Sequence, residues 1–194
     1  MVETHERVEK AHEAAHHHDN KRIAVVITLL AALLAITETA AKNAQNTYMS
    51  KHVEAANTWS FYQAKTIRLT TLKTAAETFD AMGYDAYGPH AERVAKQVQR
   101  WRQTGDRYES EPDTGEGRKE LMAKARATEA ERDRAHAKLH MFEYGSASFQ
   151  LAIVLASAAV ITGVGALALA GLGLGAIGIA FGALGWFAPT LLHL

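Results

Sequence analysis

Hydrophobic and polar positions divide this chain into two kinds of stretch. Residues 144–194 contain no Asp, Glu, Lys or Arg, and residues 23–36 are almost purely aliphatic. About 20 consecutive apolar residues in a helix cross a bilayer core of roughly 30 Å. We therefore predict three transmembrane helices, with a turn at Ala170 and Gly171 between the last two. The predicted spans are 23–41, 149–169 and 172–192.

The stretch between the first and second predicted crossings is polar but keeps the periodicity of a helix. Residues 43–82 contain no glycine or proline, and two sets of apolar or small residues recur there at helical spacing. One set includes Trp59 and Leu69, and the other includes Val53 and Ile67. Two stripes indicate a helix that has packing partners on two sides.

Two turns divide the remainder of this polar region. Glycine and proline at 83–90 and at 109–117 break the helical pattern, and helices are predicted at 91–108 and 118–143. The predicted fold class is all-α, with three transmembrane helices and a long extramembrane antiparallel helical stalk. This coiled-coil-like stalk, two or three helices thick, covers residues 42–148.

Composition and charge narrow the range of partners. Lys plus Arg and Asp plus Glu both total 21, so the chain lacks the excess positive charge that holds nucleic acid. The absence of cysteine excludes disulfides, thiolate chemistry and zinc–cysteine sites. We expect a lipid bilayer as the partner, no nucleic acid and no identifiable small-molecule substrate.

Basic residues beside the first crossing set the expected orientation. Lys21 and Arg22 precede that crossing and Glu38 lies at its other end, which favours a cytoplasmic amino terminus. Lys42 and Lys51 on the stalk side oppose this assignment. We predict a bacterial inner-membrane protein with a periplasmic stalk.

A polar, histidine-rich tail at 1–22 contains His12, Glu13 and His16 in an H-E-x-x-H pattern. That pattern supplies two zinc ligands and a general base in metalloproteases, but it needs a third ligand and a shaped cavity. Neither is indicated, so we interpret the tail as a solvated helix face and expect no metal and no catalytic residue.

More than half of the 14 glycines lie between residues 163 and 185. Gly173, Gly175 and Gly178 match the dinucleotide fingerprint, but no strand precedes them and no acidic residue follows, so no cofactor is expected. Gly171 with Gly175, and Gly178 with Gly182, form G-x-x-x-G pairs that let helix backbones approach closely in lipid. We favour packing between protomers, with packing inside the hairpin as the alternative.

Glu38 is an ionisable residue inside a predicted membrane span, which makes it a candidate intramembrane polar site. It lies near the far end of that span, however, where it can reach water.

The segment 55–68 is the most specific stretch of the chain, because it combines large rings with donors at helical spacing. These residues are Trp59, Phe61, Tyr62, Gln63, Lys65 and Arg68. We interpret them as helix-packing residues, with the lysine and arginine paired to acids on the third stalk helix. The alternative is a ligand or partner surface.

With the histidine-rich tail, the first apolar helix and the terminal hairpin, this segment resembles W-x-[FY]-Y-Q-A-K of an uncharacterised bacterial inner-membrane family, domain of unknown function 4337. The resemblance covers nearly the whole chain. It implies a shared membrane architecture and no assigned activity.

The pattern as a whole favours an oligomeric integral membrane protein without enzymatic activity, acting as a scaffold or envelope-interaction module. The alternative is a channel or transport accessory whose pathway is lined by Glu38 or by the glycine-rich hairpin. An enzyme is not expected, because the sequence offers no set of nucleophile, base and cavity.

Overall fold

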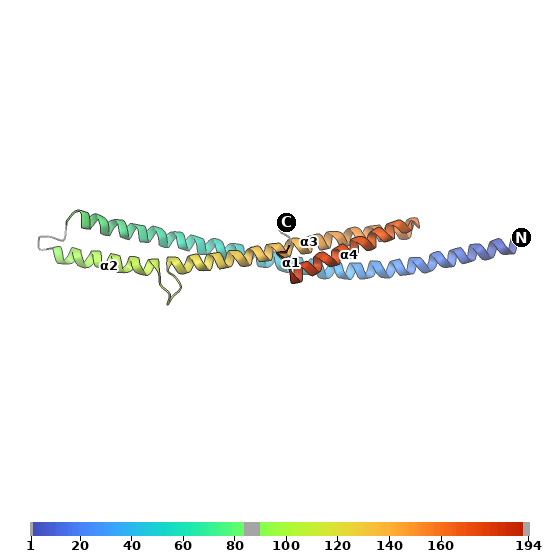
Figure 1. Ribbon diagram of the computed structural model, residues 1–194, viewed down its shortest axis with the longest axis horizontal. Helices are drawn as coiled ribbons and strands as arrows, with labels where there is room; N and C mark the ends of the chain where they lie inside the picture. Colours follow the sequence, from blue (N-terminus) through green and yellow to red (C-terminus); the bar gives the residue numbers. More distant parts are fainter. Residues whose placement is uncertain (1, 84–89, 192–194) are drawn as a thin grey trace. The chain divides into compact units, whose positions relative to one another are not determined.

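The computed structural model describes residues 2–83 and 90–191, with side chains from Lys21 onward. Within these residues the chain forms helices and no strand (Figure 1). The helices are α1 (Val2–Ala81), α2 (Ala91–Glu109), α3 (Arg118–Thr162) and α4 (Gly165–Phe187). By length and composition, α1, α3 and α4 are each able to cross a membrane. The all-α class and the three apolar helices are therefore confirmed.

Helix α1 joins two elements that the sequence analysis separates. The predicted crossing at 23–41 and the polar helix that follows it are parts of one uninterrupted helix. Residues 2–82 contain no glycine or proline, so nothing in the backbone ends the helix where the composition changes. The backbone of the predicted tail also belongs to α1, but the side chains of His12, Glu13 and His16 lie outside the described residues.

The chain divides into two compact units. The apolar unit comprises Met1–Tyr48 with Asp133–Leu194, and the polar unit comprises Met49–Arg132. Helices α1 and α3 each contribute a segment to both units, α4 belongs to the apolar unit and α2 to the polar unit.

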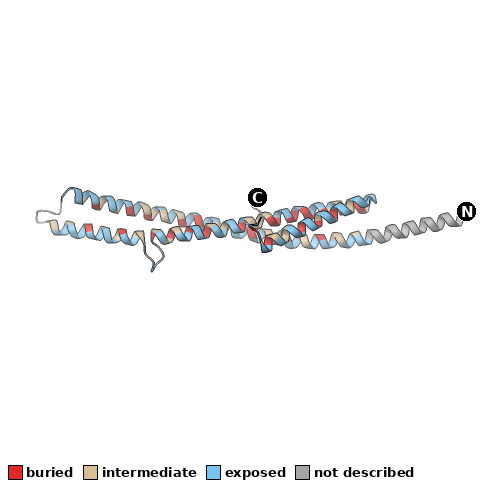
Figure 2. Ribbon diagram, viewed as in Figure 1, coloured by how far each residue is buried: buried red, intermediate tan, exposed pale blue. Residues whose placement is uncertain are grey.

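The interior of the apolar unit combines small residues with a few large side chains, and many aliphatic side chains face outward. Buried positions lie along the facing sides of the helices (Figure 2). They include several alanines and glycines and the side chain of Phe149. Val154, Ile161 and Leu169 face outward and are 62%, 85% and 72% exposed. An aliphatic exterior suits lipid, and the buried alanines and glycines allow the close packing by which helices associate there.

The turn between α3 and α4 lies at Gly163 and Val164, and the predicted turn at Ala170 and Gly171 is wrong. Gly163 has a φ of +70°, and its N–H donates to the carbonyl of Ala159 at 2.9 Å. A glycine ends a helix in this left-handed conformation without steric cost. Several glycines of this region could have done so, and Gly171 instead lies buried inside α4.

In the polar unit, α2 and then the first part of α3 pack in turn along the same face of α1. The Phe79 ring lies 5.5 Å from the Trp101 ring of α2, and Lys51 Nζ lies 2.8 Å from Glu131 of α3. Because Phe79 is near the end of α1 and Lys51 is earlier, both partner helices run antiparallel to α1. The loop at 110–117 separates them.

Candidate functional site

The segment 55–68 lies on α1 within the polar unit, and the structure divides its residues between two faces. Trp59, Tyr62 and Lys65 lie on the face that contacts α2, α3 and the loop between them, whereas Gln63 and Arg68 are exposed. Phe61 is 38% exposed at the edge of the packed face. Trp59 and Tyr62 contact each other edge to face, with ring centroids 5.3 Å apart.

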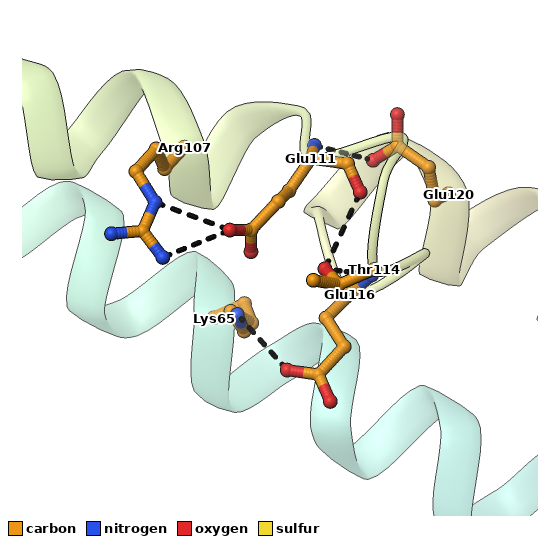
Figure 3. Close-up of polar contacts among 6 residues, drawn as sticks. All are labelled: Lys65, Arg107, Glu111, Thr114, Glu116 and Glu120. Atoms are coloured by element: carbon orange, nitrogen blue, oxygen red, sulfur yellow. Dashed lines mark hydrogen bonds and ion pairs between the residues drawn. The ribbon is translucent and has the colours of Figure 1, made fainter.

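Lys65 is the centre of the site, because it is a buried cation. The residue is 5% exposed, and its Nζ lies 4.9 Å from the ring centroid of Tyr108 and 5.4 Å from that of Phe61. Its carboxylate neighbour is Glu116, at 3.9 Å (Figure 3). Aromatic faces attract a cation, and one carboxylate offsets part of the cost of removing the ammonium from water. Lys65 therefore holds the loop against α1.

The acid that pairs with Lys65 differs from the expected one. We expected a partner on the third stalk helix, but Glu116 belongs to the loop before α3. The glycines and the proline of residues 109–117 predict a turn. They do not show which acidic side chain of the turn points toward α1. The rings of Phe61 and Tyr108 lie beside the same ammonium, but they come from different helices, so the sequence carries no signal for this contact.

Hydrogen bonds to two glutamates connect the two ends of the loop between α2 and α3. Arg107 donates two hydrogen bonds to Glu111, from Nε at 3.1 Å and Nη2 at 2.9 Å (Figure 3). Glu120 accepts from the Ser110 hydroxyl at 2.6 Å and from the Glu111 backbone N–H at 3.2 Å. The Arg107 hydrogen bonds lower the pKa of Glu111, and the Ser110 hydrogen bond lowers the pKa of Glu120.

Two further contacts attach the start of α3 to the rest of the polar unit. Arg118 Nη2 donates to Glu109 at 2.9 Å, which lowers the pKa of Glu109, and its guanidinium lies 5.9 Å from the Tyr62 ring. Trp59 Nε1 donates to Glu129 of α3 at 3.0 Å. The rings of Trp59 and Tyr62 thus contribute to the contact between α1 and α3.

The loop is tight because Gly117 is buried against its own neighbours. A Cβ atom built at Gly117 would overlap the Glu120 carboxylate and the backbone N of Glu111, and would lie 2.7 Å from Cα of Ser110. Only glycine leaves space for the hydrogen bonds of Glu120 at this point.

In the apolar unit, the predicted packing glycines contact other helices of the same chain. A Cβ at Gly171 would lie 2.9 Å from the Ala152 carbonyl of α3, and one at Gly175 would lie 2.8 Å from Cδ2 of Leu30 in α1. Gly178 faces the Phe149 ring, whereas nothing lies within 4 Å of a Cβ at Gly182. At three of the four glycines a Cβ would meet another helix of the same chain, as the alternative interpretation expects, and at Gly182 only the backbone approaches α3. Packing between protomers stays a prediction.

The backbones of Gly178 and Gly182 in α4 lie close to Gly145 of α3. A Cβ at Gly145 would lie 3.3 Å from the Gly178 carbonyl oxygen and 3.4 Å from the Gly182 backbone N. The two backbones therefore approach closely where glycine faces glycine. Gly145 is separated from the hairpin glycines in sequence, and its role could not be read from their spacing.

Glu38 is exposed in the apolar unit and accepts a hydrogen bond from Gln150 Nε2 of α3 at 3.2 Å. Sequence analysis missed Gln150, because an uncharged amide in an apolar run carries no periodic signal. Among the residues described with side chains, no group of three or more His, Cys, Asp or Glu residues is placed to hold a metal ion.

These features define an all-helical protein in which three helices suit a membrane. The chain belongs to the family described as domain of unknown function (DUF4337), whose model matches residues 19–188. The match includes the whole of α2, α3 and α4, so the resemblance inferred from the segment 55–68 and the terminal hairpin is confirmed. No curated protein and no solved structure matches the chain.

Proposed function

We propose that the protein is an oligomeric integral membrane protein without enzymatic activity, acting as a scaffold or envelope-interaction module. The apolar unit anchors it in the bacterial inner membrane with a cytoplasmic amino terminus. The polar unit is the periplasmic stalk, and it supplies the contact between copies.

The observation that carries this proposal is a second, charge-free face on α1 of the polar unit. Its positions alternate in steps of four and three, which is the heptad spacing of a coiled-coil seam. Every one of them is exposed and none is charged. This outer seam consists of Met49, Val53, Ala56, Ser60, Gln63, Ile67, Thr70 and Thr74.

Two hydroxyls of the outer seam are compatible with burial. Ser60 Oγ donates to the Ala56 carbonyl at 2.9 Å, and Thr70 Oγ1 donates to the Thr66 carbonyl at 3.0 Å. Because these hydroxyls already have partners within the helix, covering them leaves no donor unsatisfied. A second copy of the same helix meets no like charge along the seam, which suits an isologous contact between two copies.

The mass of the detergent-solubilised full-length protein tests this proposal. We expect a complex of more than one copy, and a smaller complex for the double variant V53K/I67K, which places charges on both sides of the interface. Ala95→Lys adds a charge to an exposed position of α2 and is the matched control that keeps the parent mass.

Two results would contradict the proposal. One is a monomeric parent protein. The other is a V53K/I67K variant that retains both the parent mass and the parent helix content by circular dichroism.

A further inference from the structure

A groove lies between α1 and α3 of the apolar unit, beside Glu38. Its volume is about 490 Å³, within the range of roughly 300–1,000 Å³ that is usual for small-ligand sites. Alanine and leucine side chains line part of it. Its polar lining consists of Glu38, Lys42 and Gln45 from α1 and Glu143, Ser146 and Gln150 from α3.

The groove lies where both helices change from charged to apolar. In α1, residues 23–37 carry no Asp, Glu, Lys or Arg, and Glu38 and Lys42 are the first charges after them. In α3, Glu143 is the last such residue before the charge-free remainder of the helix. If these apolar segments span the bilayer, the groove faces the level of the lipid headgroups.

The charges of the groove favour a ligand that has a cationic group. Glu38 and Glu143 bring two carboxylates against the single ammonium of Lys42. Gln150 Nε2 donates to Oε1 of Glu38 at 3.2 Å, which leaves the second oxygen of that carboxylate unused by this bond. Glu143 Oε2 lies 3.3 Å from Nδ1 of His140. Because His140 contacts Glu143, Glu38 is the carboxylate that we assign to the ligand.

A buried hydroxyl in the same groove lacks a partner. Ser146 is 8% exposed, and its Oγ has no hydrogen-bond partner among the described residues. Most buried hydroxyls on helices donate to a carbonyl of the preceding turn, as Ser148 Oγ does to the Tyr144 carbonyl at 2.8 Å. Ser146 lines the groove, and its hydroxyl, which is covered in this conformation, reaches a ligand there by a change of rotamer about the Cα–Cβ bond.

We propose that this groove binds the headgroup of an aminophospholipid, a lipid whose phosphate carries a primary ammonium arm. The ammonium donates to Glu38 and Ser146, and the phosphate pairs with Lys42. A choline headgroup has no N–H to donate, and an anionic glycerol headgroup offers no cation to the two carboxylates. The two headgroup charges thus complement Glu38 and Lys42, and Glu143 remains beside His140.

Native mass spectrometry of the full-length protein in detergent tests this assignment. The protein is mixed with equal amounts of phosphatidylethanolamine, phosphatidylcholine and phosphatidylglycerol that have the same acyl chains. We expect phosphatidylethanolamine adducts to be about tenfold more abundant than the other two adducts. One charge-assisted hydrogen bond accounts for a difference in affinity of about this size. Glu38→Gln should abolish this preference, and Glu77→Gln, which removes an exposed carboxylate of the polar unit, should retain it.

Two additional measurements keep the test decisive. Ser146→Ala leaves every charge in place and should lower the preference in the same direction, whether or not Glu38→Gln folds. Equal adduct abundance in the parent protein would overturn the proposal. A lipid preference that is unchanged both in Ser146→Ala and in a folded Glu38→Gln variant would also overturn it. Displacement of the lipid by an equal concentration of soluble phosphoethanolamine would assign the groove to a soluble ligand and overturn the lipid.

Discussion

The phenylalanine rings of α3 pack directly onto glycines of α4. A Cβ atom at Gly178 would lie 2.8 Å from Cε1 of Phe149, and one at Gly185 would lie 2.7 Å from Cε1 of Phe142. Each ring therefore fills the space that a side chain on α4 would need. In lipid, where close packing drives helix association, such ring-on-glycine contacts take over the role that large apolar side chains have in a soluble core.

Gly178→Ala tests this packing at the scale of one methyl group. The added Cβ collides with the Phe149 ring, so we expect the apolar unit to lose about 1–3 kcal/mol of stability, the usual effect of overpacking. Gly173→Ala is the matched control, because nothing lies within 4 Å of a Cβ at Gly173. Thermal unfolding of both variants in the same detergent gives the comparison, and equal midpoints would refute the packing.

Among the elements, α1 shows how one helix serves two partners in the polar unit. The face that carries Ala55, Lys65 and Leu69 is buried against α2, α3 and their loop, whereas the outer seam is exposed. The two-stripe pattern predicted partners on two sides. The returning part of the same chain is one partner. The outer seam, which shares Val53 and Ile67 with the second predicted stripe, is the surface of the proposed assembly.

The loop at 110–117 and the helix ends beside it should make the polar unit sensitive to acid. Hydrogen bonds from Arg118, Arg107 and Ser110 hold the pKa values of Glu109, Glu111 and Glu120, respectively, below the ordinary value of 4.5. Since each carboxyl has a lower pKa in the folded state than in the unfolded state, its contribution to stability is complete above the unfolded pKa. That contribution is lost as the pH falls through the folded pKa.

We therefore expect the unfolding midpoint of the polar unit, followed by circular dichroism, to fall as the pH drops below about 4.5. Glu109→Gln should lower stability at neutral pH and reduce the acid dependence, because the Arg118 hydrogen bond then lacks a titrating partner. Glu77→Gln, an exposed control for which we expect no such role, should keep the parent profile. A parent midpoint that does not change between neutral and acidic pH would contradict the expectation.

For the whole molecule, the exterior of the apolar unit determines which solvent, lipid or water, the protein needs around it. Large aliphatic side chains are exposed on α1, α3 and α4, including Val25, Leu151 and Ile179. Exposed apolar surface of this extent is unfavourable in water and is expected in lipid. The family match over residues 19–188 includes all three of these apolar segments.

We expect the full-length protein to remain in the membrane pellet after an alkaline carbonate wash and to be released by detergent. Val154→Lys introduces a charge at an exposed position of α3, where insertion costs about 2.5–3.5 kcal/mol near the middle of a span. It should lower the fraction of protein that resists the wash. Ala95→Lys in the polar unit should not, and a folded parent protein in the carbonate supernatant would refute the membrane assignment.

The sequence by itself determined the features that depend on neighbouring residues. Helix class, the apolar stretches, and the breaks near 83–90 and 109–117 follow from local composition, because Gly and Pro interrupt a helix wherever the chain is placed. These properties could be predicted before any contact was known. The absence of both residues between 2 and 82 allows α1 to be one helix, but the change of composition after residue 41 predicted separate elements there.

Only the tertiary structure decided which residues meet. Gly163 and not Ala170 or Gly171 makes the hairpin turn, because Gly171 is required inside α4 where it packs on Ala152. Lys65 is buried beside Glu116, and Glu38 meets Gln150, through contacts between segments far apart in the chain. Helical periodicity defines a face, but the residue opposite that face depends on how the helices align when they pack.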